Sequence, residues 1–330
     1  MRKIFGFITT ILILLSSCTK QEIDVVRTDD GEAPEITGGR QCAANEVLEK
    51  QIAADPARGK YLDDLELKIQ NFKDKNIANR SNVTLYVGVV VHVVHTNRDI
   101  VTDAQIASQI AVLNKDYGKT NTELSNQNIY LAGYSLANVA NCKIQFVLKQ
   151  TIRVQTSTTS FGTNDAVKKT SLGGSDPINP TTQLNIWVCD LGSGLLGYAQ
   201  FPGGNSATDG VVLDYQGFGT TSTGYSLYAA YNLGRSATHE IGHWFNLRHI
   251  WGDKRCGNDF VDDTPLHDGA NYGCPSNTTR SKCSGKPYEQ WMNYMDYTDD
   301  RCMYMFSAGQ KVRMDATIDA ARAAYVSTTP

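Results

Sequence analysis

The sequence predicts an α/β fold of the α+β kind, built as a two-part domain with a cleft between the parts. Apolar, β-branched runs alternate with amphipathic helical patterns up to about residue 246. From about residue 250 the chain turns irregular, with many aspartates, several Gly/Pro turns and the cysteines Cys256, Cys274, Cys283 and Cys302. A histidine-rich helical pattern, "HEIGHWFNLRH", lies at the junction of the two parts.

The composition limits the class of protein. The 330 residues are enough for one good-sized domain and a smaller segment. The 34 acidic and 31 basic residues give a formal net charge of -3, which argues against a nucleic-acid-binding protein because such proteins usually carry a basic surplus. No dimerisation signal stands out, so we expect a monomer.

Residues 1–18 have the pattern of a signal peptide. "MRK" is followed by the apolar run "IFGFITTILILL", which is shorter than the ~20 residues of a membrane-spanning helix. The ending "LSSC" resembles a bacterial lipobox, in which Cys18 is lipidated and anchors the protein to a membrane surface. The alternative is an ordinary signal peptide with an incidental cysteine. Either predicts export, and hence an environment in which disulfides form.

Residues 19–80 are predicted to form a tether and a helical segment. Residues 19–40 are polar, charged and glycine-bearing, which is typical of flexible chain. Asp55 and Pro56 are a favourable N-cap and first helical residue. Apolar residues then recur on one helix face, at Leu62, Leu65, Ile69 and Phe72.

Residues 81–330 are predicted to form the main domain, divided near residues 246 and 247. Its expected strands lie at 84–94, 142–148, 184–189, 196–201 and 210–215. Thr102 with Gln105, and Ser307 with Gln310, are candidate capping boxes for helices that follow them. The stretch "LGYAQFPGG", which contains Gly197, Tyr198 and Ala199, is a plausible edge strand that an extended peptide could pair with.

Three histidines form a candidate metal site. On a helix, His239 and His243 leave from one face one turn apart, and Glu240 is rotated by about a quarter-turn. His249 comes six residues after His243, so the helix must stop and the chain must double back for it to join them. Asn246 favours this reversal, because asparagine tolerates the left-handed conformation better than most non-glycine residues.

Such a site is typical of catalytic zinc. Three neutral histidines leave one coordination position open for water, whose pKa zinc lowers to ~7. Glu240 would accept the proton as general base and pass it to the leaving amine. A short His-Glu-x-x-His match can also arise by chance, but His249 makes that reading much weaker.

A methionine between tyrosines supports the same interpretation. In "NYMDY", Met295 could form an apolar floor beneath the metal, and Tyr297 could approach it. Taken alone, such residues are more often ordinary core.

These residues together resemble a known family. "HEIGHWFNLRH" and "NYMDYTDDRCMYMF", with "LGYAQFPGG", "NLGRSATHE" and "DFVDDTP", are similar to the metzincin zinc peptidases and, within them, the short microbial pappalysins. The resemblance runs from about Arg40 to the last helix and implies a metzincin-like fold, with a twisted mixed sheet and an active-site helix above a loop-rich C-terminal subdomain. It implies His239, His243 and His249 as zinc ligands, Glu240 as base, Met295 as the Met-turn residue and Tyr297 as a mobile ligand that stabilises the oxyanion.

The resemblance also implies specificity and latency. Cleavage before Arg or Lys needs a carboxylate in the pocket, for which the candidates are Asp296, Asp299 and Asp300. Cys42 resembles a pro-segment cysteine whose thiolate takes the open zinc position, with maturation near Arg80. The alternatives for Cys42 are a disulfide or a free thiol.

For the loop-rich part the resemblance implies the disulfides Cys256–Cys283 and Cys274–Cys302, and a structural calcium ion bound by aspartates such as Asp259, Asp262 and Asp263. Solvated aspartates are the alternative to calcium, and a second zinc site is a less favoured alternative to the disulfides. Cys142 and Cys189 are either buried thiols or a pair. His92 and His95 are expected in the core or lining the cleft rather than as metal ligands.

The sequence therefore predicts an exported or surface-anchored zinc endopeptidase made as a zymogen, acting on proteins or peptides. The main alternative is a surface-binding or adhesion protein on a zinc-stabilised scaffold, although such a scaffold would have no need of Glu240. A zinc hydrolase of non-peptide substrates is a third possibility, disfavoured by the edge strand and the methionine turn.

Overall fold

The computed structural model describes residues 25–26, 35–36, 39–76, 83–97, 99–125, 133–192 and 194–330. The signal peptide, Cys18 and the maturation point near Arg80 lie outside the described residues. Within the described part, no helix is both long and apolar enough to cross a membrane.

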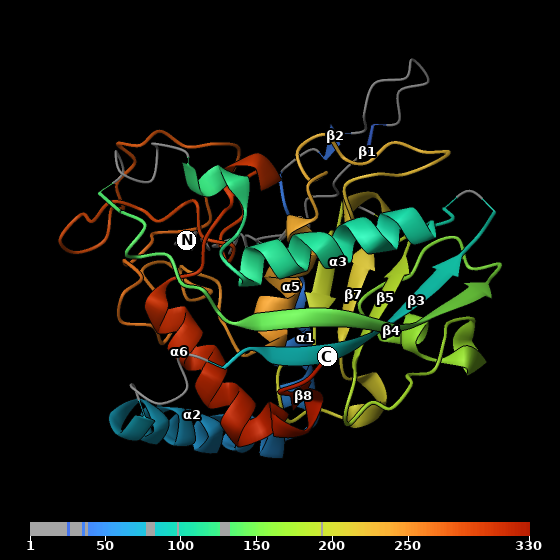
Figure 1. Cartoon of the computed structure of the whole chain (residues 1–330), viewed down its shortest axis with the longest axis horizontal. Coiled ribbons are helices and arrows are strands. Elements are labelled where there is room, and N and C mark those ends of the chain that lie inside the picture. Colours follow the sequence, from blue (N-terminus) through green and yellow to red (C-terminus); the bar gives the residue numbers. More distant parts are fainter. Residues whose placement is uncertain are drawn as a thin grey trace, which may run out of the picture.

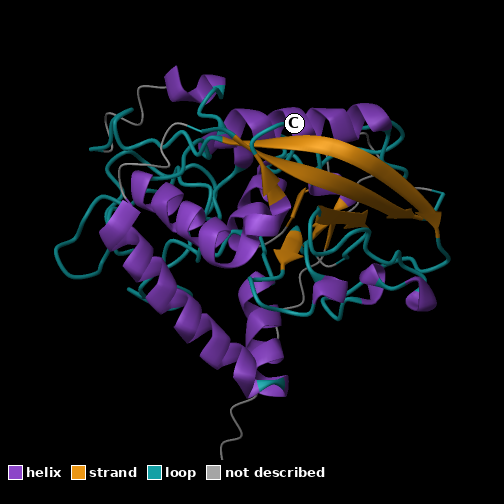
Figure 2. Cartoon of the chain, turned by 60° about the horizontal axis from the view of Figure 1, so that its bottom comes forward, coloured by secondary structure: helices purple, strands orange, loops and turns teal. Residues whose placement is uncertain are grey.

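A twisted mixed sheet forms one side of the molecule (Figures 1 and 2). Its order is β4-β3-β5-β7-β6, with β6 antiparallel to β7 at one edge and the other neighbouring strands of this order parallel. A short strand near the C-terminus, β8, pairs antiparallel with the start of β3, and β1 pairs with β2 separately. The strands are β1 (Val25–Val26), β2 (Glu35–Ile36), β3 (Leu85–His95), β4 (Ile144–Gln155), β5 (Leu184–Cys189), β6 (Gly197–Ala199), β7 (Val211–Asp214) and β8 (Val326–Ser327).

The five predicted strands are confirmed, and one of them is longer than expected. β3 and β5 are buried almost throughout, which explains why their sequences are continuous apolar runs. β4 extends to Gln155, because its second half still pairs with β3 while its side chains are mostly exposed or half-buried. That half has no apolar run from which it could be predicted. A register shift between Val89 and Val90 accommodates one extra residue of β4.

The main helices begin where their capping residues predict. Thr102 accepts a hydrogen bond from the Gln105 N–H, and Ser307 and Gln310 form a reciprocal capping box. Asp55 accepts from the Ala57 N–H and separates two helices where the sequence suggested one helical segment. The helices are α1 (Ala44–Ala54), α2 (Pro56–Asn76), α3 (Asp103–Tyr117), α5 (Arg235–Trp244) and α6 (Ala308–Thr317), which continues into a π-helical turn at Ile318–Arg322. Short 3-10 helices lie at Thr122–Ser125, Ala166–Lys168, Thr170–Leu172, Ser206–Thr208, Tyr215–Gly217, Asp300–Cys302 and Ala323–Tyr325.

The helices form two packed groups, one of which lies on the sheet. α3 and α5 pack on each other and on the sheet, and the Tyr117 hydroxyl donates to the Thr238 carbonyl between them (3.1 Å). α2 lies beside α6 (Figure 1), and Leu65 and Ile69 pack with Ala316 in a small apolar cluster. Residues 39–76 are thus an integral, packed part of this form of the chain.

The chain between α5 and α6 is mostly loop, as predicted, and is drawn orange to red in Figure 1. The disulfides Cys256–Cys283 and Cys274–Cys302 cross-link it, which confirms both pairings. Among the described cysteines, Cys142 and Cys189 are buried free thiols, so they are not a pair.

Candidate metal centre and active site

Helix α5 carries the first part of the site. His239, Glu240 and His243 are all buried. Gly242 lets the chain below approach closely, because a Cβ there would lie 2.5 Å from the sulfur of Met295. The absence of a side chain in the middle of this helix therefore places Met295 directly under the histidines.

The turn after α5 brings the third histidine back. Asn246 has a φ of 70°, its N–H donates to the His243 carbonyl (2.8 Å), and the Leu247 N–H donates to the Gly242 carbonyl (2.9 Å). This confirms the left-handed conformation predicted for Asn246. His249 then lies with its Nε2 3.1 Å from that of His243, which is also 3.1 Å from the Nε2 of His239.

The other nitrogen of each histidine faces an acceptor. Nδ1 of His239 contacts the Tyr294 carbonyl (2.7 Å), Nδ1 of His243 contacts the Leu247 carbonyl (2.8 Å), and Nδ1 of His249 contacts the Asp253 carboxylate. Each Nδ1 must therefore carry the proton, which leaves three Nε2 lone pairs facing one another. Such an arrangement is stable only with a cation between the lone pairs.

The donors fit zinc. Burial first, then the neighbouring histidines, holds the pKa of His239 and His243 well below the usual range, so both rings are neutral ligands. Zinc–nitrogen bonds of about 2.0–2.1 Å place tetrahedral ligand atoms about 3.3 Å apart, close to the separations found here. In the described part of the chain, the metal-ligand cluster is formed by these three histidines and Cys42, whose ligand atoms all lie within 4.8 Å of one another.

Cys42 reaches the same point from the N-terminal segment. Its thiol donates to the Glu240 carboxylate (Sγ to Oε2, 3.3 Å) and accepts from the Ala44 N–H (3.4 Å). Burial and then the charge of Glu240 raise the pKa of this thiol well above its usual value. A divalent cation at the histidines would oppose that effect by stabilising the thiolate.

Glu240 lies between the helix and the edge strand. A Cβ on Gly197 would lie 2.8 Å from Cγ of Glu240 and 2.8 Å from the Val212 carbonyl, so glycine is required where β6 passes the helix. Burial raises the pKa of Glu240 to about 8. A buried carboxylate beside the histidines is placed to exchange protons with a group at the metal.

Met295 and Tyr297 lie where the sequence suggested. Met295 is fully buried under α5, and its carbonyl accepts from the Ile250 N–H (3.1 Å). The Tyr297 ring lies 5.0 Å from His249 and 5.7 Å from His239, and its hydroxyl donates to the Cys42 carbonyl (3.2 Å).

Strand β6 is paired along its outer edge by the N-terminal segment. The Leu196 N–H donates to the Gln41 carbonyl and the Ala43 N–H to the Gly197 carbonyl (3.0 Å each), in a parallel bridge between Cys42 and Gly197. This edge can therefore accept an extended chain. Tyr198 and Ala199, both buried, are the next residues of the same strand.

The three aspartates near Met295 have different roles. Asp300 is buried and receives the Arg40 guanidinium (2.5 Å) together with the Leu233 and Arg235 N–H groups (2.9 and 3.1 Å). Asp296 is bound by Asn271 and the Tyr297 N–H, so it braces the turn rather than facing a pocket. Asp299 contacts Arg301 and lines a neighbouring cavity of about 370 Å³.

The three aspartates predicted to bind calcium do not converge on one point. Asp259 accepts from Val261 N–H and the Thr264 hydroxyl, which closes its own loop. Asp263 accepts from Ser307 and Gly309 at the start of α6, and Asp262 is exposed and faces Lys73 (3.8 Å). Among the described residues these three aspartates form no common ligand cluster, so calcium binding by them stays a prediction.

The N-terminal helices add two further polar contacts. The Arg58 guanidinium donates to the carbonyls of Phe201 (2.7 Å) and Pro202 (2.6 Å), just after β6. Glu66 forms a two-point ion pair with Arg313 (2.7 and 2.8 Å), whose Nε donates to the Asn246 carbonyl (2.8 Å). The segment is thus tied to both sides of the site.

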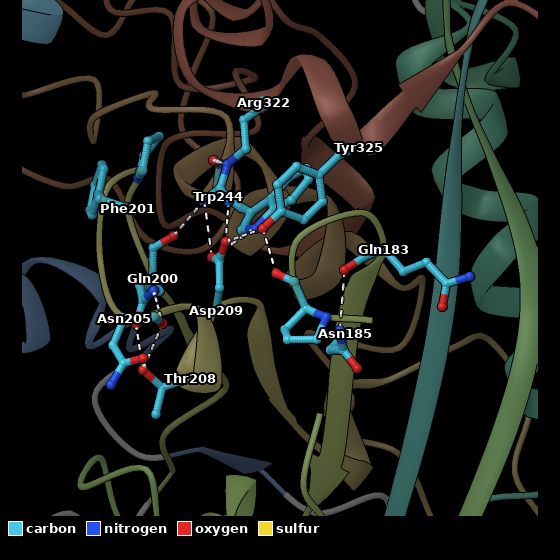
Figure 3. A network of polar contacts seen from close by, with 12 residues as sticks. Gln183, Asn185, Gln200, Phe201, Asn205, Thr208, Asp209, Trp244, Arg322 and Tyr325 are labelled. Atoms are coloured by element: carbon cyan, nitrogen blue, oxygen red, sulfur yellow. Dashed lines mark hydrogen bonds and ion pairs between the residues drawn. The ribbon is translucent and has the colours of Figure 1, made fainter. Parts of the chain in front are cut away.

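A polar network fixes the loop after β6 to the end of α5 (Figure 3). Asp209 accepts from the Trp244 indole (3.1 Å) and the Tyr325 hydroxyl (2.8 Å), and it pairs with Arg322. Arg322 also donates to the Gln200 carbonyl (3.3 Å). These contacts therefore connect the segment that follows the edge strand with the end of α5.

Two histidines of β3 lie outside the cluster. His92 is buried between Ser175 and Asn185 (2.8 Å each) and stacks on Trp187, while the ring of His95 contacts the backbone of Thr96. Neither joins the metal cluster of the described residues.

Sequence reasoning missed Arg40, Trp251 and Asp253. Arg40 precedes Cys42 by two residues, and this basic residue beside a candidate zinc ligand was the available signal. Trp251 and Asp253 follow His249 at positions +2 and +4, in a stretch treated only as irregular loop.

Comparison with known proteins gives consistent matches. Residues 174–319 match the sequence profile of the family described as pregnancy-associated plasma protein-A peptidases. An extracellular metalloprotease of Pyricularia oryzae is 32% identical over 244 residues, covering 72% of this chain and 76% of the relative. One from Neurospora crassa is 35% identical over 243 residues, covering 71% and 73%.

Solved structures show the same fold. A mutant of Tannerella forsythia promirolysin is 39% identical with a TM-score of 0.74, covering 85% of this chain and 94% of that one. Mature mirolysin of the same organism, in complex with a cleaved peptide, is 40% identical with a TM-score of 0.66, covering 73% and 97%.

Proposed function

Since the chain belongs to the pappalysin family of zinc metallopeptidases, we propose that it is an exported endopeptidase, made as a zymogen, that cleaves before Arg or Lys. The relatives named extracellular metalloproteases support export. The observation that carries the proposal is the convergence of three Nε2 lone pairs beside the buried carboxylate of Glu240.

His239, His243 and His249 would hold the zinc ion. Bound there, zinc supplies a Lewis acid that polarises the scissile carbonyl and makes water acidic enough to react near neutral pH. Glu240 then takes a proton from the attacking water and passes it to the leaving amine. The Tyr297 hydroxyl, released from the Cys42 carbonyl, donates to the oxyanion that develops on the substrate.

The edge of β6 would bind the substrate backbone. Gly197, Tyr198 and Ala199 offer this edge, now paired by residues 41–43, to an extended peptide. Because Arg40 places its guanidinium on Asp300, Asp300 is the one of the three candidate aspartates that we propose recognises the basic residue after the scissile bond.

Latency would depend on residues 19–80 as pro-segment, with 81–330 as the catalytic domain. Cys42 would occupy the coordination position that water needs, and Arg40 the specificity pocket. Cleavage near Arg80 would begin maturation. The related promirolysin is likewise a pro-form by its name.

The remaining features are proposals from the sequence and the family. We propose lipid attachment at Cys18 and a monomeric enzyme. Calcium stays a prediction from the family resemblance. To share an ion, Asp259, Asp262 and Asp263 would have to leave their present partners.

The test uses the chain from residue 19 beside its Glu240→Ala variant. Both are incubated with zinc and an unfolded protein mixture, and the fragments are sequenced by mass spectrometry. We expect cleavage only by the parent, before Arg or Lys, and a loss of about 10²–10⁴-fold or more in the variant. Equal cleavage by both would exclude Glu240 as the base. If neither cuts after removal of residues 19–80 with zinc bound, the adhesion-protein alternative replaces the enzyme.

A further inference from the structure

The three histidines differ in what holds their Nδ1 atoms. His239 and His243 are held by backbone carbonyls, which any sequence with this fold provides. His249 is held by the side chain of Asp253. The third ligand alone depends on a carboxylate that a single substitution can remove.

An unusual turn brings Asp253 back to His249. Gly252 and Asp253 have φ values of 64° and 59°, so two consecutive residues are left-handed. The Gly252 N–H donates to the His249 carbonyl (2.8 Å), and a Cβ on Gly252 would lie 2.5 Å from the Asn258 nitrogen. The turn is therefore tight and supported from the following loop.

The backbone conformation at Asp253 does not explain why this residue is an aspartate. Glycine adopts a φ of 59° without strain, whereas aspartate does so less readily. The carboxylate nevertheless occupies this position, and it is the group that contacts the histidine. The presence of the Asp253 side chain is therefore what has to be explained.

The contact is sheltered. Trp251 stacks on the His249 ring at 4.4 Å with an interplanar angle of 6°, which covers one ring face. The Asp253 side chain is 17% exposed and that of His249 2%. A hydrogen bond to a carboxylate is stronger in such surroundings than in water.

We propose that Asp253 is a positioning residue for the metal. Its carboxylate holds the Nδ1–H of His249, directs Nε2 at the point that His239 and His243 share, and makes the ring a better electron donor. Carboxylate partners of metal-bound histidines act in this way in general. The inference rests on the proposed zinc site and concerns how firmly the ion is held.

The experiment measures zinc retention in the chain from residue 19. Asp253→Asn and Asp253→Gly are compared with the parent in the Glu240→Ala background, which prevents self-cleavage. Zinc release is followed with a colorimetric chelator in excess. We expect release about 10–100-fold faster from Asp253→Gly and an intermediate rate from Asp253→Asn, because asparagine keeps an acceptor but loses the charge.

Asp165→Asn is the matched control. Asp165 has a φ of 60° and pairs with Lys168 (2.9 Å), so it is a left-handed aspartate with a charged partner outside the metal cluster. We expect this variant to release zinc like the parent. Thermal unfolding of the zinc-free proteins separates positioning from folding: zinc-free Asp253→Gly should unfold at or above the temperature of the parent.

Two results would overturn the inference. The first is equal zinc release from the parent and Asp253→Gly. The second is a drop in the unfolding temperature of Asp253→Gly that is as large without zinc as with it, since the carboxylate would then support only the loop. A parent that takes up no zinc would contradict the proposed function as well, whereas retention by parent and variant alike contradicts this inference alone.

Discussion

At the scale of single residues, Asp300 connects the proposed latency with the proposed specificity. Its carboxylate is fully buried, yet it receives two backbone N–H groups and a guanidinium. A buried carboxylate of this kind is stable only when its partners are in place. If residues 19–80 are removed as proposed, Arg40 leaves with them, and a basic side chain of the substrate would restore the pair.

Asp300→Asn should therefore change selectivity more than overall activity. We expect kcat/KM for peptides with Arg after the scissile bond to fall about 30-fold or more, because losing one partner of a buried ion pair costs about 2 kcal/mol or more. Peptides with a neutral residue there should lose less. The measurement is kcat/KM on a matched pair of peptides.

Asp299→Asn serves as control, since Asp299 contacts Arg301 beside the neighbouring cavity. It should leave the ratio between the two peptides close to that of the parent. An unchanged ratio in Asp300→Asn would show that basic residues are recognised elsewhere.

The residue scale also shows what sequence can and cannot predict. The histidine spacing and Asn246 follow local helix geometry, so the metal cluster and the left-handed turn could be predicted. The pair of Arg40 and Asp300 spans 260 positions, and no local pattern connects its members. Only the fold brings them together, which is why three aspartates remained candidates.

At the scale of elements, α2 is a second attachment of the proposed pro-segment. Glu66 pairs with Arg313, which is 1% exposed and also holds the Asn246 carbonyl at the turn between the zinc ligands. Arg58 binds the backbone just after β6. Helix α2 thus supports both the turn at Asn246, through Arg313, and the backbone that follows the edge strand β6.

Glu66→Gln should weaken this attachment. Arg313 would keep a buried charge without its carboxylate, and because Glu66 is 30% exposed we expect a loss of only about 1–2 kcal/mol in the free energy of unfolding. Denaturant unfolding in the Glu240→Ala background measures it. In the active background, maturation should begin sooner.

Asp64→Asn is the matched control on the same helix. Asp64 pairs with Lys60 in an exposed contact, which should contribute less than about 0.5 kcal/mol. If Glu66→Gln lowered the free energy of unfolding as little as Asp64→Asn, the ion pair of α2 would not contribute to the attachment.

Helices and strands could be predicted where burial or helix capping produces a recognisable pattern in the sequence. Continuous apolar runs marked β3 and β5, and capping residues marked the starts of α3 and α6. The outer half of β4 has mixed polar side chains, and its strand conformation depends on pairing with β3. Tertiary pairing overrides local propensity there.

At the scale of the whole molecule, the proposed pro-segment contacts the proposed catalytic domain at several separate places. Residues 41–43 pair with β6, Arg40 pairs with the buried Asp300, and α2 packs on α6. Cys42 is the one contact that would compete directly with water for the metal. We therefore expect latency and attachment to be separable properties of the same segment.

Cys42→Ala tests this separation. We expect the variant to fold and keep its pro-segment attached, because Arg40, Arg58 and Glu66 are unchanged, yet to activate about tenfold faster or more. Tenfold corresponds to a loss of about 1.4 kcal/mol from the latent state. The time course of fragments on incubation with zinc gives the rate, and Cys142→Ala, which removes another free thiol, gives the control.

Unchanged activation kinetics in Cys42→Ala would mean that occupation of the cleft by residues 40–43, rather than a thiolate at the metal, keeps the enzyme silent. Activation of both variants alike would point to a general loosening of the fold, so only acceleration confined to Cys42→Ala assigns latency to the cysteine.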